Sequence, residues 1–210
     1  ETASKYKDCW FHAGEFSDSL ALSSFTQELS YYFNLFKEIP NAKLELRTKS
    51  SNIRELMELS PQKNIITSFS ISPEKIAKEI DLKTPSTKHR ILSMQKIFNA
   101  GFPVAIHLDP IIYTSNWLND YEELVASINH LFPIKDIEYI SIGVVRFTDN
   151  VFHQFKKNYG NSDILKSTMI KSFDQKLRYP QPLRKKILRE TENLLKRYGL
   201  SNSKIYQCME

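Results

Sequence analysis

Apolar residues in this chain alternate between short strand-like runs and longer stretches with helical spacing. Five runs, at 6–15, 43–50, 64–72, 102–110 and 137–147, each end in a polar or charged side chain. The four gaps between these runs contain helix-like stretches. This alternation is typical of β-α units whose strands form one parallel sheet. The pattern therefore predicts an α/β fold.

Apolar residues that recur every three to four positions predict helices over 20–36, 52–59, 86–98, 117–132 and 183–198. Ser19 is expected to cap the first helix, and Gly101 lies at the kind of position where helices commonly end. Residues 160–182 are polar and irregular, which predicts a long loop lying over the body. Residues 204–209 predict a last short strand.

The number of strands limits the architecture. A closed barrel of this class needs eight βα units and about 250 residues, whereas this chain of 210 residues supplies five clear strands. We therefore expect a partial, open βα barrel over residues 1–150, with residues 151–210 as a basic helical extension packed on it. Because the chain begins on a strand with no helix before it, it is expected to start within a larger domain.

Composition excludes several classes of protein. Apolar residues make up 41% and charged residues 25% of the chain, as in soluble globular proteins. No apolar run approaches the ~20 residues of a membrane span, and no secretory signal opens the chain, so we expect a cytoplasmic protein without a membrane partner. Cys9 and Cys208 form no C-x-x-C pair, which argues against a zinc site. Both are expected to be reduced, small buried residues.

Positive charge is concentrated towards the carboxyl end. Residues 156–204 contain 13 lysines and arginines against 4 acidic residues, within a chain of net charge +5. Such a basic segment predicts attraction to a polyanion such as DNA, and it is equally compatible with a solvated helix face. The residues that we assign to nucleic-acid binding are Arg146, Arg184, Lys185 and Lys186.

Polar side chains follow the ends of the predicted strands. Ligands of parallel sheets bind at the carboxyl ends of the strands, so these groups are expected to share one rim. They are Glu15, Ser17, Lys49, Ser70, Asp109 and Arg146.

Sequence blocks across nearly the whole chain match a known family in consistent order. They are GEFSDSLAL, LELRTKS, SFSIS, KTPSTKHR, AGFPVAIHLDPIIYTSNWLNDY and YQCME. Together they resemble the radical S-adenosylmethionine proteins of the spore photoproduct lyase type. The resemblance implies a partial βα barrel that binds a 4Fe-4S cluster and S-adenosylmethionine. In that family, cleavage of the cofactor gives a 5′-deoxyadenosyl radical, which in the best-known members reverses a thymine dimer in DNA.

The resemblance also implies roles for the rim residues. Ser17, Lys49 and Ser70 match the serine, lysine and serine that bind the methionine end of the cofactor in the family. Glu15 resembles the glutamate at which many radical enzymes bind the cofactor's amino group, and a carboxylate can accept from an ammonium in a charge-assisted contact. Asp109, at a strand end, could reach a ligand or a ribose hydroxyl.

Simpler interpretations of the same residues stand beside these. Lys49 could pair with Glu15 on the surface, at little energetic gain, and Ser70 could cap the following turn. Asp109 before a proline is ordinary turn chemistry, so its two interpretations are balanced. Arg146 could neutralise Asp109, and His107, in the middle of a strand, is expected to be packed rather than catalytic.

Two departures from the family pattern matter. The family holds its cluster with cysteines spaced C-x3-C-x2-C, and iron–sulfur ligation needs such thiolates, but this chain has none of them. We therefore expect a carboxyl-terminal portion of a longer enzyme that is inactive alone. Glu15 also stands where the family has a hydrogen-donating cysteine, which argues against the usual repair route. The alternative function is a non-catalytic nucleic-acid-binding barrel module.

Overall fold

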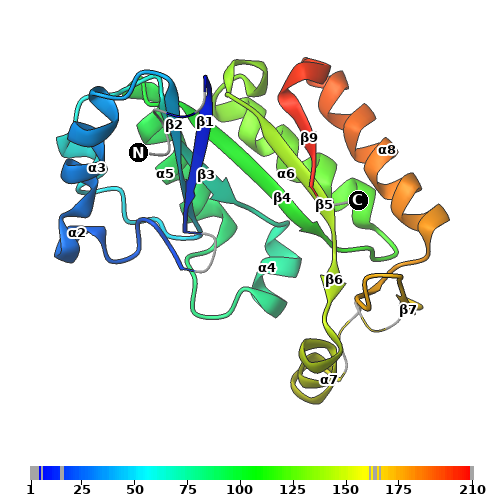
Figure 1. Ribbon diagram of the computed structural model, residues 1–210. Coiled ribbons are helices and arrows are strands. Elements are labelled where there is room, and N and C mark those ends of the chain that lie inside the picture. Colours follow the sequence, from blue (N-terminus) through cyan, green and yellow to red (C-terminus); the bar gives the residue numbers. More distant parts are fainter. Residues whose placement is uncertain are drawn as a thin grey trace.

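Six parallel strands form the main sheet of the computed structural model, which describes residues 5, 7–14, 17–160, 162, 165 and 167–208 (Figure 1). The strand order in the described chain is β1-β2-β3-β4-β5-β9, and each neighbouring pair is parallel. The predicted α/β class is therefore confirmed. The strands are β1 (Cys9–Ala13), β2 (Ala42–Thr48), β3 (Ile65–Ser70), β4 (Val104–Ile111), β5 (Ile140–Val144) and β9 (Ile205–Gln207).

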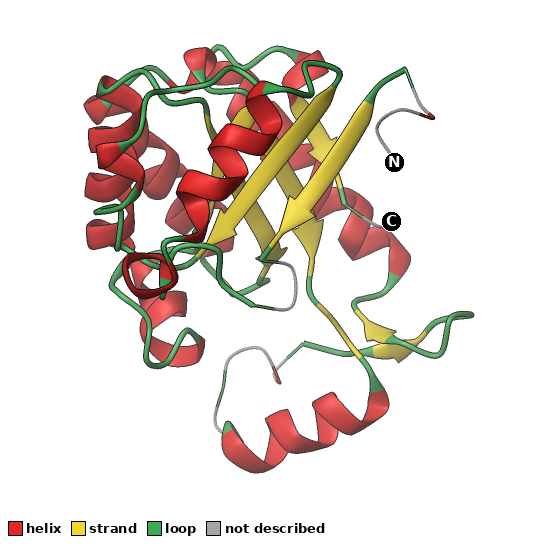
Figure 2. Ribbon diagram, turned by 60° about the vertical axis from the view of Figure 1, so that its left-hand side comes forward, coloured by secondary structure: helices red, strands yellow, loops and turns green. Residues whose placement is uncertain are grey.

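Helices cover one face of this sheet and enclose the hydrophobic core with it (Figures 1 and 2). Apolar strand residues such as Leu44, Leu46 and Ile106 are buried in this core. Amphipathic helices complete it, because each turns an apolar stripe toward the sheet. The helices are α2 (Ser23–Thr26), α3 (Glu28–Lys37), α4 (Glu74–Ile80), α5 (Thr87–Asn99), α6 (Trp117–Leu131) and α8 (Gln181–Arg197), with short 3₁₀ turns at Leu56–Glu58, Ile134–Asp136 and Asn202–Lys204.

The sheet curls so that its two edges approach each other on the inner face. Trp10 lies on the edge strand β1 and Tyr206 on the opposite edge strand β9, yet their ring centroids are 6.1 Å apart. Tyr139 contacts both rings, at 5.4 Å and 5.3 Å. These aromatic contacts join the edges of a half-barrel, in agreement with the predicted open barrel.

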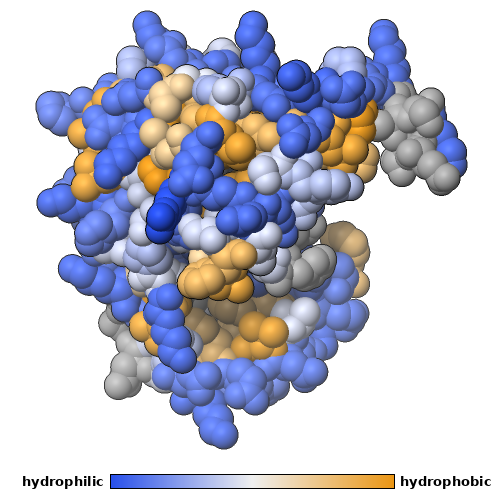
Figure 3. All heavy atoms as spheres, turned by 90° about the vertical axis from the view of Figure 1, so that its left-hand side faces the viewer, coloured by the Kyte–Doolittle hydropathy of each residue, from blue (hydrophilic) through white to orange (hydrophobic). Residues whose placement is uncertain are grey.

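An arm projects past the carboxyl ends of the strands (Figures 1 and 2). It contains β6 (Arg146–Phe147), α7 (Asp149–Asn158), β7 (Ile170–Lys171) and β8 (Leu177–Arg178), and the three strands pair antiparallel in the order β6-β8-β7. In the space-filling view the arm lies below the main body across a recess (Figure 3). The long loop predicted over 160–182 is thus wrong, because a hairpin occupies part of it, and α7 was not predicted.

Two predicted helices differ from the structure. The helix predicted over 20–36 is broken at Gln27, whose φ of 53° is left-handed, so that α2 and α3 are separate. The predicted Ser19 cap is wrong, because α2 begins at Ser23 and has no side-chain cap; the Asp18 Oδ1 accepts from the backbone N–H groups of Leu20 and Ala21 in the turn before it. The helix predicted over 52–59 is a single 3₁₀ turn at Leu56–Glu58.

Other local predictions are confirmed. The helix predicted over 86–98 is α5, and Gly101 follows it with a φ of +87°. The Ser86 hydroxyl caps this helix by accepting from the backbone N–H of His89. The last predicted strand is β9, which pairs with β5. Residue 150 lies inside α7, and α8 packs on β5 and α6. The division into two parts at this residue therefore stays a prediction.

No helix in the described part of the chain is long and apolar enough to cross a membrane.

Gly14 is a position where we expect a side chain to be poorly tolerated. Its φ is +84°, and an added Cβ would lie 2.4 Å from the Arg47 carbonyl oxygen. Gly101 has a similar φ, but an added Cβ there meets nothing closer than 3.8 Å. Gly101→Ala should therefore lower the free energy of unfolding by about 1–2 kcal/mol, through backbone strain alone. Gly14→Ala should lower it by about 1–3 kcal/mol more, because the added methyl group also overpacks the site. Urea unfolding measures both, and equal losses would contradict this account.

Candidate functional site

The inner face of the half-barrel carries a cavity of about 400 Å³ on the side of the sheet away from the hydrophobic core. Alternation along the strands explains its polar character, because in β2 the residues Leu44 and Leu46 face the core while Glu45 and Arg47 line the cavity. Strands β1, β2, β4, β5 and β9 all contribute to it. Its lining includes Trp10, His12, Glu45, Arg47, His107 and Cys208.

Glu45 is the centre of the polar cluster at this cavity, and only 1% of it is exposed. Its Oε2 lies 2.5 Å from Nδ1 of His12, and its Oε1 lies 2.6 Å from Nε2 of His107. The Ser68 hydroxyl donates to the same Oε1 at 2.5 Å. The Nδ1 atom of His107 is buried and has no hydrogen-bond partner in the described part of the chain. His107 is therefore packed, as predicted, but within a polar cluster.

These contacts decide the ionisation of Glu45. Burial alone would raise the pKa of its carboxyl group, because a charge is less stable away from water. The hydrogen bonds from His107 and Ser68, together with the charge of His107, outweigh burial and lower the pKa to about 2. Glu45 is consequently ionised over the whole range in which the protein is expected to work.

Asp18 ties the loop after β1 to the end of β2. Its Oδ1 accepts from the Thr48 hydroxyl at 2.7 Å, and its Oδ2 accepts from the backbone N–H of Lys49 at 2.7 Å. Because Asp18 adjoins Ser17, this pair of hydrogen bonds brings Ser17 to the end of the strand that leads into Lys49. Ser17 itself is exposed.

A second network links Lys49 to the end of β3. The Lys49 Nζ lies 2.5 Å from Oδ1 of Asp81, and Arg90 donates both to Oδ2 of Asp81 at 3.0 Å and to the Ser70 carbonyl oxygen at 2.9 Å. Arg90 and the carboxylate of Asp81 are almost fully buried. The Ser70 hydroxyl accepts from Nε of Arg47 at 3.3 Å, and no side chain caps α4, which follows Ser70.

The third part of the rim lies at the ends of β4 and β5. A Cβ added at Gly143 would lie 2.7 Å from Oδ1 of Asp109, so the missing side chain leaves room for that carboxylate. Asp109 and Arg146 both lie close enough to the Cys208 thiol to affect its pKa. Burial and the Asp109 charge raise the pKa of this thiol above its ordinary value, against the opposing effect of Arg146.

The structure places the predicted rim residues as follows. Ser17 lies in the loop after β1, Lys49 directly follows β2, and Ser70 is the last residue of β3. Asp18, the neighbour of Ser17 in the chain, bonds to the Lys49 backbone, and the Asp81–Arg90 pair connects Lys49 to Ser70. Lys49 pairs with Asp81, and Glu15 lies outside the described residues, so the predicted Lys49–Glu15 contact stays untested.

Sequence reasoning missed Glu45 and Asp81. Glu45 alternates with leucines and therefore gives the pattern of a solvent-facing position, while Asp81 directly follows α4. No local signal marks their partners, because these lie on other strands and helices. Cys9 and Cys208 are free but only half-buried, which corrects the prediction that both are buried.

The predicted nucleic-acid residues other than Arg146 lie on α8, on the outer surface. Arg184 donates to the Tyr179 carbonyl oxygen at 2.9 Å, while Lys185 and Lys186 are exposed. Farther along the helix, Lys196 pairs with Glu192, and Arg197 with Glu122. The positive charge of α8 is therefore partly balanced within the fold.

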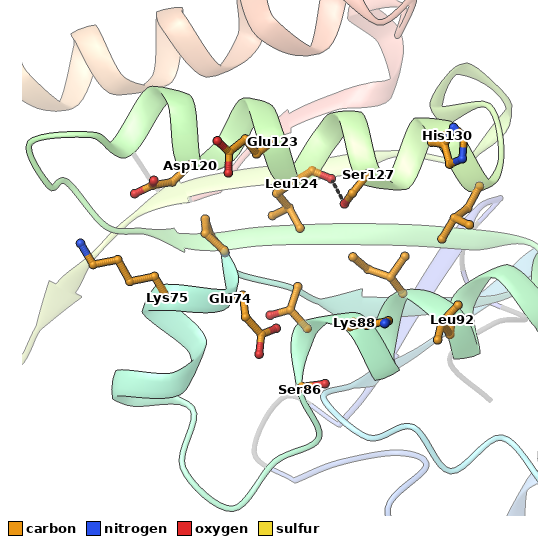
Figure 4. A pocket seen from close by; sticks show the side chains of 14 residues that line it. Glu74, Lys75, Ser86, Lys88, Leu92, Asp120, Glu123, Leu124, Ser127 and His130 are labelled. Atoms are coloured by element: carbon orange, nitrogen blue, oxygen red, sulfur yellow. Dashed lines mark hydrogen bonds between the residues drawn. The ribbon is translucent and has the colours of Figure 1, made fainter.

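A second cavity, of about 810 Å³, lies on the outer surface between the start of α4, α5 and α6. Figure 4 shows its side chains, with Lys75 and Lys88 on one wall and Asp120 and Glu123 on the other. It contains none of the rim residues, and we do not assign the site to it.

The comparisons with known proteins agree with this geometry. The family model of spore photoproduct lyase matches residues 3–194. This chain belongs to the spore photoproduct lyase family. Curated spore photoproduct lyases from Clostridium acetobutylicum and Bacillus subtilis are each 24% identical to it, over 154 and 152 residues. These alignments cover 73% and 71% of this chain but 46% and 44% of the relatives, so the chain spans a little less than half of their length.

Solved structures of spore photoproduct lyase share the fold. One, complexed with dinucleoside spore photoproduct, has a TM-score of 0.81 at 18% identity, and the match covers 98% of this chain and 64% of that one. Another, a mutant with bound AdoMet and dinucleoside spore photoproduct, has a TM-score of 0.80 with the same identity and coverage. The predicted resemblance to this family is thereby confirmed.

We expect Glu45 to give the fold a stability that depends on pH. Its folded pKa of about 2 lies below the ordinary value near 4.3, so its contribution of about 3 kcal/mol is complete above pH ~4.5 and is lost as pH falls toward 2. Urea unfolding should therefore show a large loss for Glu45→Gln at pH 6 that shrinks at pH 3. The exposed Glu123→Gln is the control and should change little. A loss for Glu45→Gln that is the same at both pH values would contradict the assignment.

Proposed function

We propose that this chain supplies the S-adenosylmethionine-binding part of a radical lyase that acts on UV-damaged thymine in DNA. The observation that carries the proposal is the joining of Ser17, Lys49 and Ser70 at one rim through Asp18 and the Asp81–Arg90 pair. These three residues match the family's binding residues for the methionine end of the cofactor. Bound AdoMet and a dinucleoside photoproduct in a related structure support the proposed ligands.

The chemistry of the rim suits the methionine end of the cofactor. The hydroxyls of Ser17 and Ser70 can donate to a carboxylate, and the Lys49 ammonium adds a charge-assisted contact. Glu15 is proposed to accept from the cofactor's ammonium, and Asp109 to accept from a ribose hydroxyl. When bound beside a cluster, S-adenosylmethionine supplies the means to abstract a hydrogen atom from the substrate.

The chain itself does not fit a 4Fe-4S cluster. Its two cysteines are too few for the thiolate ligands that such clusters need. Cys9 packs against the hydrophobic core, whereas Cys208 lines the cavity on the other face of the sheet. We propose that cysteines outside this chain hold the cluster in a longer cytoplasmic protein, and that the chain alone is inactive.

The arm suits contact with DNA. At the turn of the β7–β8 hairpin the Phe173 side chain is 93% exposed. Lys176 follows it in the hairpin, while Lys171, on the other side, pairs with Asp149. Exposed aromatic rings stack on bases, and nearby lysines attract the phosphate backbone. The alternative of a non-catalytic nucleic-acid-binding module shares this feature, so DNA binding by itself supports both functions.

Cofactor binding tests the leading proposal directly. Isothermal titration of the chain with S-adenosylmethionine should show binding, and Ser70→Ala should weaken it about tenfold, the value of one hydrogen bond to a charged group. Ser127→Ala is the matched control, because among the described residues the Ser127 hydroxyl bonds only to the Leu124 carbonyl oxygen in the same outer helix. The proposal fails if the chain does not bind the cofactor, or if the two variants bind it equally well.

DNA binding tests the role of the arm. Phe173→Ala should weaken binding of thymine-rich single-stranded DNA about tenfold, from the loss of one stacked base. Lys176→Gln should instead lower the dependence of binding on salt concentration. Fluorescence anisotropy measures both, and Phe25→Ala is the control, because Phe25 on α2 is 87% exposed. If the Phe25→Ala and Phe173→Ala variants lose the same affinity for DNA, the arm has no special role in DNA binding.

A further inference from the structure

Arg47 is a cation to which the sequence patterns assigned no role. It lies near the end of β2, is half-buried and lines the 400 Å³ cavity of the inner face. Its Nε donates to the Ser70 hydroxyl at 3.3 Å. In the described part of the chain, no carboxylate lies within ion-pair distance of the Arg47 guanidinium group. The two terminal nitrogens of this group therefore have no protein partner among the described residues.

The described acidic groups around the cavity are already engaged. Both oxygens of Glu45 accept hydrogen bonds from His12, His107 and Ser68. Asp81 is shared between Lys49 and Arg90. Asp109 lies close enough to the Cys208 thiol to raise its pKa. Arg47 therefore gives the inner side of the rim a positive charge that none of these described carboxylates balances.

The backbone at Arg47 is fixed by the loop after β1. The Ser19 N–H donates to the Arg47 carbonyl oxygen at 3.0 Å, and Gly14 packs so closely that no side chain would fit there. Register in β2 is set on both sides, by β1 and by β3. The hydrogen bond to Ser70 then holds the planar guanidinium at the level of the predicted cofactor residues.

We propose that Arg47 forms an oxyanion subsite in this cavity and binds a carboxylate or phosphate group of the ligand. A guanidinium matches the geometry of such groups, because it can donate two parallel hydrogen bonds to them. A half-buried cation without a counter-ion is costly, and an oxyanion removes that cost. The inference rests on the proposed function, under which the oxyanion is either the carboxylate of S-adenosylmethionine or the phosphodiester of the DNA substrate.

Binding measurements on the complete chain test this subsite. The probes are S-adenosylmethionine, the dinucleotide thymidylyl-thymidine and inorganic phosphate, each titrated by calorimetry. Arg47→Gln should weaken at least one of the first two about ten- to hundredfold, the value of a charged bidentate contact. Arg47→Lys should restore only part of that affinity, because an ammonium cannot make the paired contact. Inorganic phosphate should bind weakly and lose its binding in Arg47→Gln.

Lys43→Gln is the matched control, since Lys43 belongs to the same strand but its ammonium lies over the Trp10 ring, 5.9 Å from the centroid. The Lys43→Gln variant should bind all probes like the unchanged chain, and thermal unfolding checks that each variant folds.

If Arg47→Gln weakens the binding of S-adenosylmethionine alone, the subsite belongs to the cofactor. If it weakens the binding of the dinucleotide alone, the subsite belongs to the substrate. Binding that persists unchanged in Arg47→Gln overturns the subsite and leaves the proposed function intact. If the unchanged chain binds none of the probes, both proposals fail.

Discussion

One buried carboxylate, that of Glu45, holds together the inner face of the half-barrel. It joins four neighbouring strands, because His12 belongs to β1, Glu45 to β2, Ser68 to β3 and His107 to β4. A closed barrel fills its interior with layers of apolar side chains, whereas this sheet does not close. Here a polar cluster centred on Glu45 takes much of that place beside a small apolar cluster of Ile66, Ala105 and Tyr139, and the main hydrophobic core lies on the helical face.

The rim depends on this arrangement. With the strands held in register, two short networks bring distant residues to one edge: Asp18 connects the loop after β1 to the end of β2, and Asp81 with Arg90 connects the end of β2 to that of β3. Neither network needs a ligand to form. A ligand that enters would therefore meet side chains that are already oriented, which lowers the conformational cost of binding.

The arm and the half-barrel differ in how they are built. The barrel rests on long strands, a continuous core and a buried carboxylate, while the arm has two-residue strands, and Phe173 and Ile170 are exposed on it. Within the arm, the rings of Phe147, Phe152 and Phe155 pack together. Under the proposed function the rigid part positions the cofactor, and the arm presents exposed groups to DNA beside the same edge.

The sequence by itself determined the architecture and the edge that carries the rim. Alternating β and α patterns specify a parallel sheet, and the carboxyl ends of parallel strands must share one edge. Ser17, Lys49 and Ser70 could therefore be placed together from their positions along the chain alone. Local signals also sufficed for α5, where Ser86 caps the start and Gly101 follows the end. Such features depend on neighbours within a few residues.

Only the tertiary structure decided which charges meet. Glu45 and His107 are 62 positions apart, and Lys49 and Asp81 are 32 apart, so no local pattern could reveal either contact. The hairpin of the arm escaped detection for a similar reason, since its two-residue strands are defined by the pairing of β8 with β6 and with β7 rather than by their own composition. The left-handed Gln27 likewise divides a continuous helical pattern. Contacts between distant segments, rather than local propensity, fix these features.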